Sequence, residues 1–91
     1  MIEFSELALA GLKDCTEDDD RATALRYSIS LHLSHPDAIK KSIRLVEPAD
    51  RAVYMFPLGK WRITWEPRFE DGLPSGLVWS VAMLRSANPA G

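Results

Sequence analysis

The sequence contains a single cysteine, Cys15, which excludes a framework of intrachain disulfides and is typical of a protein in a reducing compartment. It has no apolar run near the roughly 18 residues that a membrane-spanning helix needs. The longest such run, over residues 76–84, includes Ser80. The few glycines form no phosphate-binding loop. The chain begins with acidic residues where a signal peptide is basic, so we expect a cytoplasmic protein.

The residues that are present are typical of one folded domain. Hydrophobic residues make up 46% of the 91 and charged residues 26%, which indicates a chain that buries a core. Three Trp, three Phe and two Tyr supply bulky core side chains. We expect a single domain over residues 1–85 and a flexible C-terminal tail over residues 86–91.

Charge is unevenly distributed along the chain. The formal net charge of −2 gives no reason to expect nucleic acid or a membrane as the partner. Residues 1–20 hold seven acids and one base, a net charge of −6, whereas residues 21–91 hold ten bases and six acids, a net charge of +4. Such an acidic segment either occupies a basic site on a partner or forms the start of a helix, where the helix dipole favours acids.

The first third of the chain predicts a helix and then a strand. Over residues 2–13 the apolar side chains recur at near-helical spacing, which predicts an amphipathic helix followed by an acidic connector over residues 14–20. The alternative for this connector is a further helical turn, with Thr16 as its cap and the acids in its first turn. Over residues 25–33 apolar residues alternate strictly with polar ones. This alternation predicts a half-buried strand, centred on Ile29, with its odd-numbered side chains in the core.

Residues 36–46 allow two interpretations. Pro36 at a first helical position, Asp37 beside it and an apolar stripe after them predict a short helix. The alternative is a strand over residues 42–47 that pairs with the next strand, because short apolar runs are ambiguous by periodicity.

The second half of the chain predicts three strands. Pro57 bounds the first of them, and Pro67 ends the second or confines it to a sheet edge. The last strand is apolar on both faces and is therefore expected to be central in the sheet. The predicted segments are a strand over 52–56, a turn over 58–59, a strand over 61–66, a loop over 68–76 and a strand over 77–84.

This order, α-β-α-β-β-β, predicts an α+β fold: a small single domain with a mostly antiparallel four-stranded sheet and two helices on one face. Trp61, Trp65 and Trp79 are expected to help build the core. The other sheet face is expected to be polar with interspersed aromatic residues, unlike a purely solvated surface.

We interpret that polar and aromatic sheet face as an interaction surface, because aromatic and Arg side chains dominate binding hot spots. Its candidate residues are Arg26, His32, Tyr54, Phe56, Arg62 and Thr64. In the alternative register of the strand over residues 52–56, Tyr54 and Phe56 lie in the core while Val53 and Met55 face outward.

Residue types that carry catalysis or bind metals stand in no recognised pattern. His32 and His35 are three positions apart, so one strand cannot place both on one face, and no paired ligand spacing completes a zinc site. Cys15 has no cationic neighbour in the sequence to activate its thiol. The acids of residues 17–20 are consecutive and lack the central Gly of a calcium loop. We therefore expect no catalytic residue, no metal and no cofactor.

These observations favour a small non-enzymatic protein-binding module, such as an adaptor, an inhibitor or an immunity-like protein. Its partner would be another protein or a second copy of the chain, as a homodimer. The alternative is a small-molecule-binding or small enzyme domain, with a pocket between sheet and helices or at a dimer seam. Lys40, Lys41 and Arg44 would suit a basic patch, but the acidic balance of the chain argues against nucleic acid as the partner.

Overall fold

The computed structural model describes residues 1–70 and 73–84, which form two helices and five strands. The elements are, in chain order, β1 (Ile2–Phe4), α1 (Glu6–Cys15), α2 (Asp19–Leu33), β2 (Ile43–Arg44), β3 (Tyr54–Leu58), β4 (Trp61–Glu70) and β5 (Leu73–Met83). In the part of the chain described, neither helix is long and apolar enough to cross a membrane. The expected tail over residues 86–91 lies outside the described residues.

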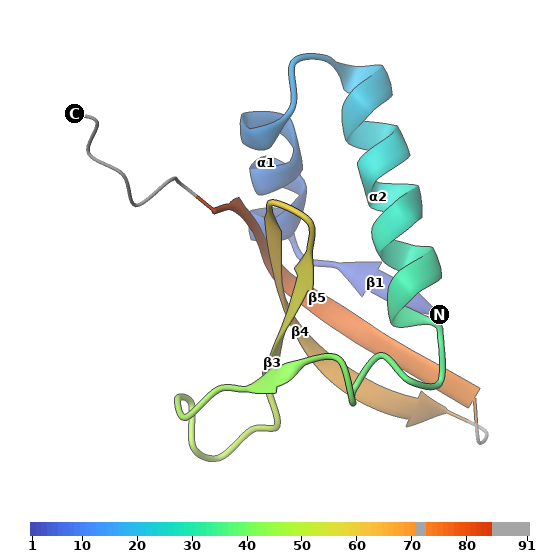
Figure 1. Cartoon of the computed structure of the whole chain (residues 1–91), viewed down its shortest axis with the longest axis vertical. Coiled ribbons are helices and arrows are strands. Elements are labelled where there is room, and N and C mark those ends of the chain that lie inside the picture. Colours follow the sequence, from blue (N-terminus) through green and yellow to red (C-terminus); the bar gives the residue numbers. More distant parts are fainter. Residues whose placement is uncertain (71–72, 85–91) are drawn as a thin grey trace.

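The five strands form one sheet in the order β1-β5-β4-β3-β2. Strands β2 to β5 pair antiparallel with their neighbours, and β1 pairs parallel with β5. Figure 1 shows α1 and α2 side by side over one side of this sheet. The predicted α+β fold, with a mostly antiparallel sheet and two helices on one face, is confirmed, as is the central place of the last strand. The sheet has five strands rather than four, and the element order is β-α-α-β-β-β-β.

The core lies between the two helices and the sheet. Trp65 on β4 is 2% exposed, and its indole N–H donates a hydrogen bond to Ser42 Oγ at 3.1 Å. Trp61 packs against the edge of the same cluster. The core role predicted for Trp61 and Trp65 is thus confirmed. The buried cluster consists of Ala8, Leu12, Ile29, Leu33, Ala38, Phe56, Ile63, Trp65, Val78 and Val81.

The predicted strand over residues 25–33 is wrong, because these residues belong to α2. Leu25, Ile29 and Leu33 are four residues apart, so they line one face of a helix as readily as one face of a strand. The two interpretations differ at Tyr27 and Leu31. A strand would bury both side chains, whereas α2 leaves them 67% and 57% exposed.

A capping residue and local charge explain why this segment is helical. Asp18 is the N-cap of α2, and its carboxylate accepts a hydrogen bond from the backbone N–H of Arg21 at 2.8 Å. Asp19 and Asp20 occupy the first turn, where the helix dipole favours negative charge. Of the acidic connector predicted over residues 14–20, the last three residues therefore begin this helix, while the first two belong to α1.

The helix predicted over residues 2–13 is confirmed from Glu6 onward, where α1 lies, whereas residues 2–4 form β1 before the helix begins. Ser5 is the N-cap of α1, and its Oγ accepts a hydrogen bond from the Ala8 N–H at 3.0 Å. The residues before this cap form β1 because they pair parallel with β5. Ile2 and Phe4 pack against the core from there.

The helix predicted over residues 36–46 is wrong, and the alternative strand is right in part. Residues 36–41 form turns, in which Ala38 is buried and accepts a hydrogen bond from Ser42 Oγ at 2.8 Å. Since Trp65 also binds Ser42 Oγ, this segment is held against the sheet instead of continuing as a helix. β2 follows and pairs antiparallel with β3.

Pro57 and Pro67 lie inside strands rather than at strand ends. β2 pairs with β3 only at Tyr54 and Met55, so β3 is an edge strand at Pro57. Pairing between β3 and β4 ends where Tyr54, the first residue of β3, pairs with Trp65. Pro67 lies beyond that point, so it has only β5 as a neighbouring strand. Proline is tolerated at such edges because no partner needs its missing N–H.

The later strands have different bounds from those predicted. The strand predicted over residues 52–56 begins and ends two residues later, and the strand predicted over residues 61–66 continues to Glu70. The predicted loop over residues 68–76 is wrong in its described part, which extends β4 and β5 as a hairpin. The turn predicted over residues 58–59 is confirmed at Gly59, whose φ of 59° favours glycine.

Candidate functional site

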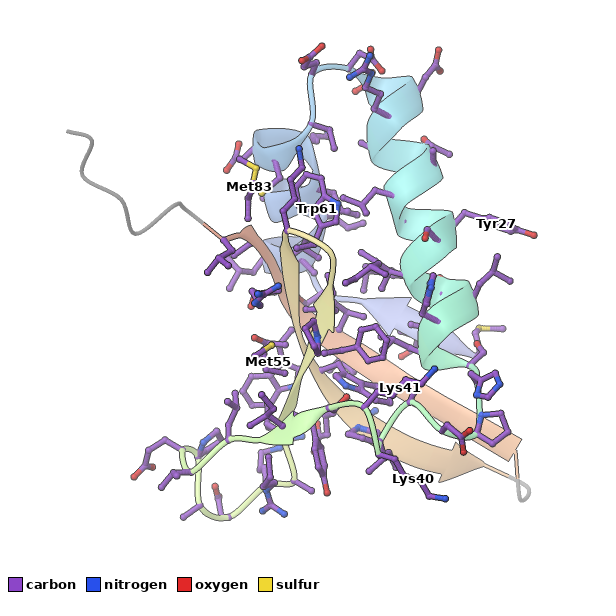
Figure 2. The ribbon with its side chains drawn as sticks, viewed as in Figure 1. Tyr27, Lys40, Lys41, Met55, Trp61 and Met83 are labelled. Atoms are coloured by element: carbon purple, nitrogen blue, oxygen red, sulfur yellow. The ribbon has the colours of Figure 1, made fainter. Side chains whose placement is uncertain are left out.

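No described helix covers the sheet on the side opposite α1 and α2, and this side is named the open face. Because side chains alternate along a strand, the neighbours of the buried residues Phe56, Ile63 and Trp65 point to it. Figure 2 shows Met55 on this side of β3 and Trp61 on the helical side. The open face consists of Met55, Pro57, Arg62, Thr64, Glu66, Leu77, Trp79 and Ser80.

A β-bulge in β5 turns Trp79 onto the open face. Thr64 pairs with Ser80 and Trp65 pairs with Val78, which leaves Trp79 as an extra residue. In a regular strand, Trp79 would lie on the same side as the buried Val81. The bulge shifts the alternation by one residue, so Leu77 and Trp79 reach the open face instead. The core position predicted for Trp79 is therefore wrong.

An apolar hollow of about 350 Å³ lies on the open face, where β4, β5 and the start of α1 meet. Leu7, 69% exposed, stands at this hollow together with Leu77 and Trp79. Its complete lining is Ser5, Leu7, Thr64, Leu77, Trp79 and Ser80. The volume is within the range of about 300–1,000 Å³ that is usual for binding pockets.

Ser5 fixes the position of Leu7 over the hollow. The Ser5 hydroxyl donates a hydrogen bond to the Trp79 carbonyl at 2.8 Å and accepts one from the Ala8 N–H. The Ser5 backbone N–H donates to the Val78 carbonyl at 3.0 Å. The first turn of α1 is thus tied to β5 at the bulge, and Leu7 follows two residues later.

Arg51 and Glu66 form a bidentate ion pair beside the hollow. Arg51 Nε lies 3.1 Å from Glu66 Oε2, and Arg51 Nη2 lies 2.9 Å from Oε1. Arg68 Nη2 approaches the same carboxylate at 3.4 Å. The Arg51 guanidinium also lies over the Trp79 ring, 5.4 Å from its centroid. These contacts hold the loop between β2 and β3 against β4 and β5.

The ion pair keeps both groups charged. Hydrogen bonds from Arg51 hold the pKa of Glu66 below its ordinary value, although partial burial of the carboxyl acts in the opposite direction. The same hydrogen bonds raise the pKa of Arg51. The Trp79 indole N–H lies close enough to Glu66 to lower its pKa further. Its geometry is not that of a hydrogen bond, so this buried N–H has no partner among the described residues.

The structure brings together only part of the predicted interaction surface. Arg62 and Thr64 lie on the open face, as predicted. Phe56 is 4% exposed and Tyr54 packs against the core, so the alternative register is right for these two residues. Met55 faces outward in agreement with that register, whereas Val53, which precedes β3, is buried.

Arg26 and His32 lie on α2, so their predicted place on the sheet face is wrong. The Arg26 guanidinium lies over the Phe4 ring at 5.1 Å from its centroid. His32 Nδ1 is 2.8 Å from the Ser28 carbonyl oxygen, and its ring lies 6.0 Å from the Phe56 ring. Both side chains therefore contact the sheet from the helical layer, on the side away from the open face.

Leu7, Leu77 and Trp79 were not predicted at this surface. The available signal for Leu7 is the N-cap Ser5, which sets the start of α1 and turns Leu7 away from the core-facing Ala8. No sequence signal marks the bulge, because the residues around Trp79, apart from Ser80, are apolar on both sides of the strand.

Other hollows fit an apolar ligand less well. The hollows under α2 are small, about 160 Å³ beside Leu31 and about 90 Å³ beside Trp65. Two of larger size, about 320 and 350 Å³, have charged side chains in their walls, Lys13 and Asp14 among them. Within residues 1–70 and 73–84, no group of three or more His, Cys, Asp or Glu stands close enough to hold a metal ion.

No protein-family model and no curated protein sequence matches the chain. Among solved structures, it is similar to a chain of the crystal structure of the toxin–antitoxin complex RelBE2 from Mycobacterium tuberculosis. The TM-score is 0.59 and the sequence identity 13%, over 91% of this chain and 95% of that chain. At this identity the likeness shows a shared fold and leaves function to be argued from the site.

Proposed function

We propose that this protein is a small non-enzymatic protein-binding module that receives a partner protein on its open face. The observation that carries the proposal is the apolar hollow around Leu7, Leu77 and Trp79. Large apolar side chains gathered at the surface, with polar groups at their rim, are typical of protein interaction sites. Trp is also among the residues most often found at the centre of binding hot spots.

The surroundings of the hollow indicate the chemistry of the partner. The Arg51–Glu66 pair satisfies its own charges and requires no counter-charge from outside. Thr64 and Ser80 supply hydroxyl groups at the wall of the hollow. A partner segment that inserts an apolar side chain, such as Leu, Ile or Phe, and offers backbone polar groups to these hydroxyls fits this surface.

The structural neighbour supports a protein partner. That protein was crystallised as a toxin–antitoxin complex, so this fold occurs in a protein that assembles with a different protein. Cys15 is free, which suits a reducing compartment, and we propose a cytoplasmic location for the interaction. Whether the role is that of an adaptor, an inhibitor or an immunity-like protein depends on the partner.

The alternative of a small-molecule-binding or small enzyme domain has less support. Its pocket was expected between the sheet and the helices or at a dimer seam. At the first of these places, the hollows under α2 have volumes of about 160 and 90 Å³. Both are below the usual size of a ligand pocket. These volumes argue against a ligand pocket between the sheet and the helices.

The test compares two charged substitutions on opposite sides of the molecule. Leu7→Glu introduces a charge at the hollow, and Leu31→Lys introduces one on the outer side of α2. Each suits the helix dipole at its own position, so neither should unfold its helix. Tagged wild-type protein is used to capture partners from lysate of the source cells, and the captured protein is then purified and titrated by calorimetry.

We expect Leu7→Glu to weaken binding of that partner at least about tenfold, since a buried charge replaces an apolar contact. Leu31→Lys should bind as the wild type does. A partner that binds both variants equally well would overturn the proposal, as would the absence of any protein whose capture depends on Leu7.

A further inference from the structure

The outer side of α2 exposes an apolar ridge, defined here as Ala24, Tyr27 and Leu31. Their spacing of three and four residues places them on one side of the helix, opposite Ile29 and the rest of its buried face. Figure 2 shows Tyr27 pointing away from the body of the protein. The outer side of a surface helix is normally polar, so this ridge is unusual for a helix that has no partner.

The two ends of the ridge carry opposite charge. Residues 17–21 hold four acids and one base, a net charge of −3, at the N-terminal end of α2. Residues 35–44 hold three bases and one acid, a net charge of +2 with both histidines neutral, beyond its C-terminal end. Figure 2 shows Lys40 and Lys41 below that end of the helix.

These charges do not neutralise each other within one molecule. A helix of 15 residues is about 22 Å long, and charges interact weakly beyond about 8–10 Å at physiological salt. The helix dipole accounts for acids in the first turn, but it does not account for the apolar ridge between the two charged ends.

We propose that α2 packs antiparallel against α2 of a second copy of this chain. The antiparallel arrangement brings the acidic end of each copy to the basic end of the other, with the two ridges in contact between them. A parallel arrangement would bring like charges together. One helix that carries an apolar centre and opposite charges at its ends is complementary to itself, which is the requirement for a two-fold symmetric interface.

The spacing of the side chains suggests how the two helices meet. With the two-fold axis level with Ile29, Tyr27 of one copy lies against Leu31 of the other. In the same arrangement, Asp19 and Asp20 of one copy lie towards the C-terminal end of α2 of the other, below which Figure 2 shows Lys40 and Lys41.

The dimer should be weak. A single pair of helices buries less than the roughly 1,600 Å² of a standard interface, so we expect a dissociation constant in the micromolar range or above. The dimer is therefore expected in concentrated solution and at low salt.

Sedimentation equilibrium on the full chain tests the proposal, from about 20 µM to about 1 mM, the range that a weak interface requires. The wild-type mass should rise from 10.2 kDa towards twice that value with concentration. Leu31→Lys and, as a second variant, Tyr27→Glu should remain monomeric, with circular dichroism showing that each is folded. Leu7→Glu is the matched control and should dimerise as the wild type does.

Charge reversal tests the role of the two ends. Lys40→Glu with Lys41→Glu makes both ends acidic, and Asp19→Lys with Asp20→Lys makes both ends basic. Each double variant alone should lose most of its self-association, and an equal mixture of the two should regain it.

A wild-type chain that stays monomeric at the highest concentration would overturn the proposal. So would a Leu31→Lys variant that dimerises normally, or a mixture that fails to regain association. None of these outcomes affects the proposed function, which depends on Leu7 and the open face rather than on α2.

Discussion

Arg51 links three parts of the molecule. It holds the Glu66 carboxylate by two hydrogen bonds, covers the ring of Trp79 and, through its backbone carbonyl, accepts a hydrogen bond from Arg44 at 3.3 Å. The loop between β2 and β3 therefore depends on an exposed residue for its attachment to the sheet. Because Trp79 also lines the apolar hollow, the same contact bears on the shape of the proposed binding surface.

The Arg51–Glu66 pair predicts a pH dependence of stability. The pKa of Glu66 is lower in the folded protein than its ordinary value of 4.5, so the pair stabilises the fold fully above that value. The stabilisation is lost as the pH falls through the folded-state pKa. Urea denaturation of the wild type and Arg51→Ala at a series of pH values should show a difference in free energy of unfolding that narrows in acid.

The matched control is Arg21→Ala, which removes exposed contacts with Glu17 and Asp18 on α2. Pairs of this kind contribute little to stability, so its difference from the wild type should be small at every pH. If the difference in free energy of unfolding between Arg51→Ala and the wild type stayed constant down to acid pH, the Arg51–Glu66 pair would not be the source of the pH-dependent stability.

At the scale of elements, α1 and β5 pack so closely that a single methyl group decides their fit. Gly11 faces β5, and a Cβ at this position would overlap the carbonyl oxygen of Val81. The sequence alone suggests that Gly11 weakens its helix, because glycine is a poor helix former. The structure indicates that glycine is required there for the helix to approach the strand.

Gly11→Ala is therefore predicted to destabilise the protein by about 1–3 kcal/mol, the usual cost of overpacking. Helix propensity alone would predict a gain of about 1 kcal/mol from the same change. Urea denaturation measures the free energy of unfolding. Ala10→Gly, at the exposed neighbouring position, serves as the control. It should lower the free energy of unfolding only by the difference in helix propensity between alanine and glycine. A stabilised Gly11→Ala variant would show that α1 does not pack as described.

Because α2 is a helix, substitutions at Ile29 and Leu31 should affect stability differently. Ile29 is fully buried, so Ile29→Ala should cost about 2–4 kcal/mol through lost burial and cavity formation. Leu31 is exposed, so Leu31→Ala should change the stability of the monomer by less than about 0.5 kcal/mol. Thermal or urea denaturation at low protein concentration provides the comparison. A strand would bury both side chains, and similar losses at both positions would contradict the helix.

At the scale of the whole molecule, the fold has a helical layer and a sheet layer, and each layer has one side that the other does not cover. The helical layer exposes the apolar ridge of α2, and the sheet layer exposes the open face with its apolar hollow. The buried core separates these two surfaces, so both can be occupied at the same time. If both proposals hold, a dimer through α2 presents two open faces that point away from each other.

The sequence by itself determined the fold class and the central hairpin. Trp61, Ile63 and Trp65 alternate with polar residues, and Gly59 before them supplies a turn with positive φ, so β3 and β4 follow from local chemistry. The same alternation turned Thr64 to the open face. Each of these features depends on neighbours within a few residues, which is the range over which sequence patterns report burial.

Only the tertiary structure decided α2 and the bulge. Leu25, Ile29 and Leu33 satisfy a helix and a strand equally well, and the choice depends on which surface is available to bury them. Here the Asp18 cap and the apolar face of the sheet favour the helix. Likewise, Trp79 reaches the open face because β5 bulges where Trp65 pairs with Val78. The residues of β5 alone do not show this bulge, because it depends on how β5 pairs with β4.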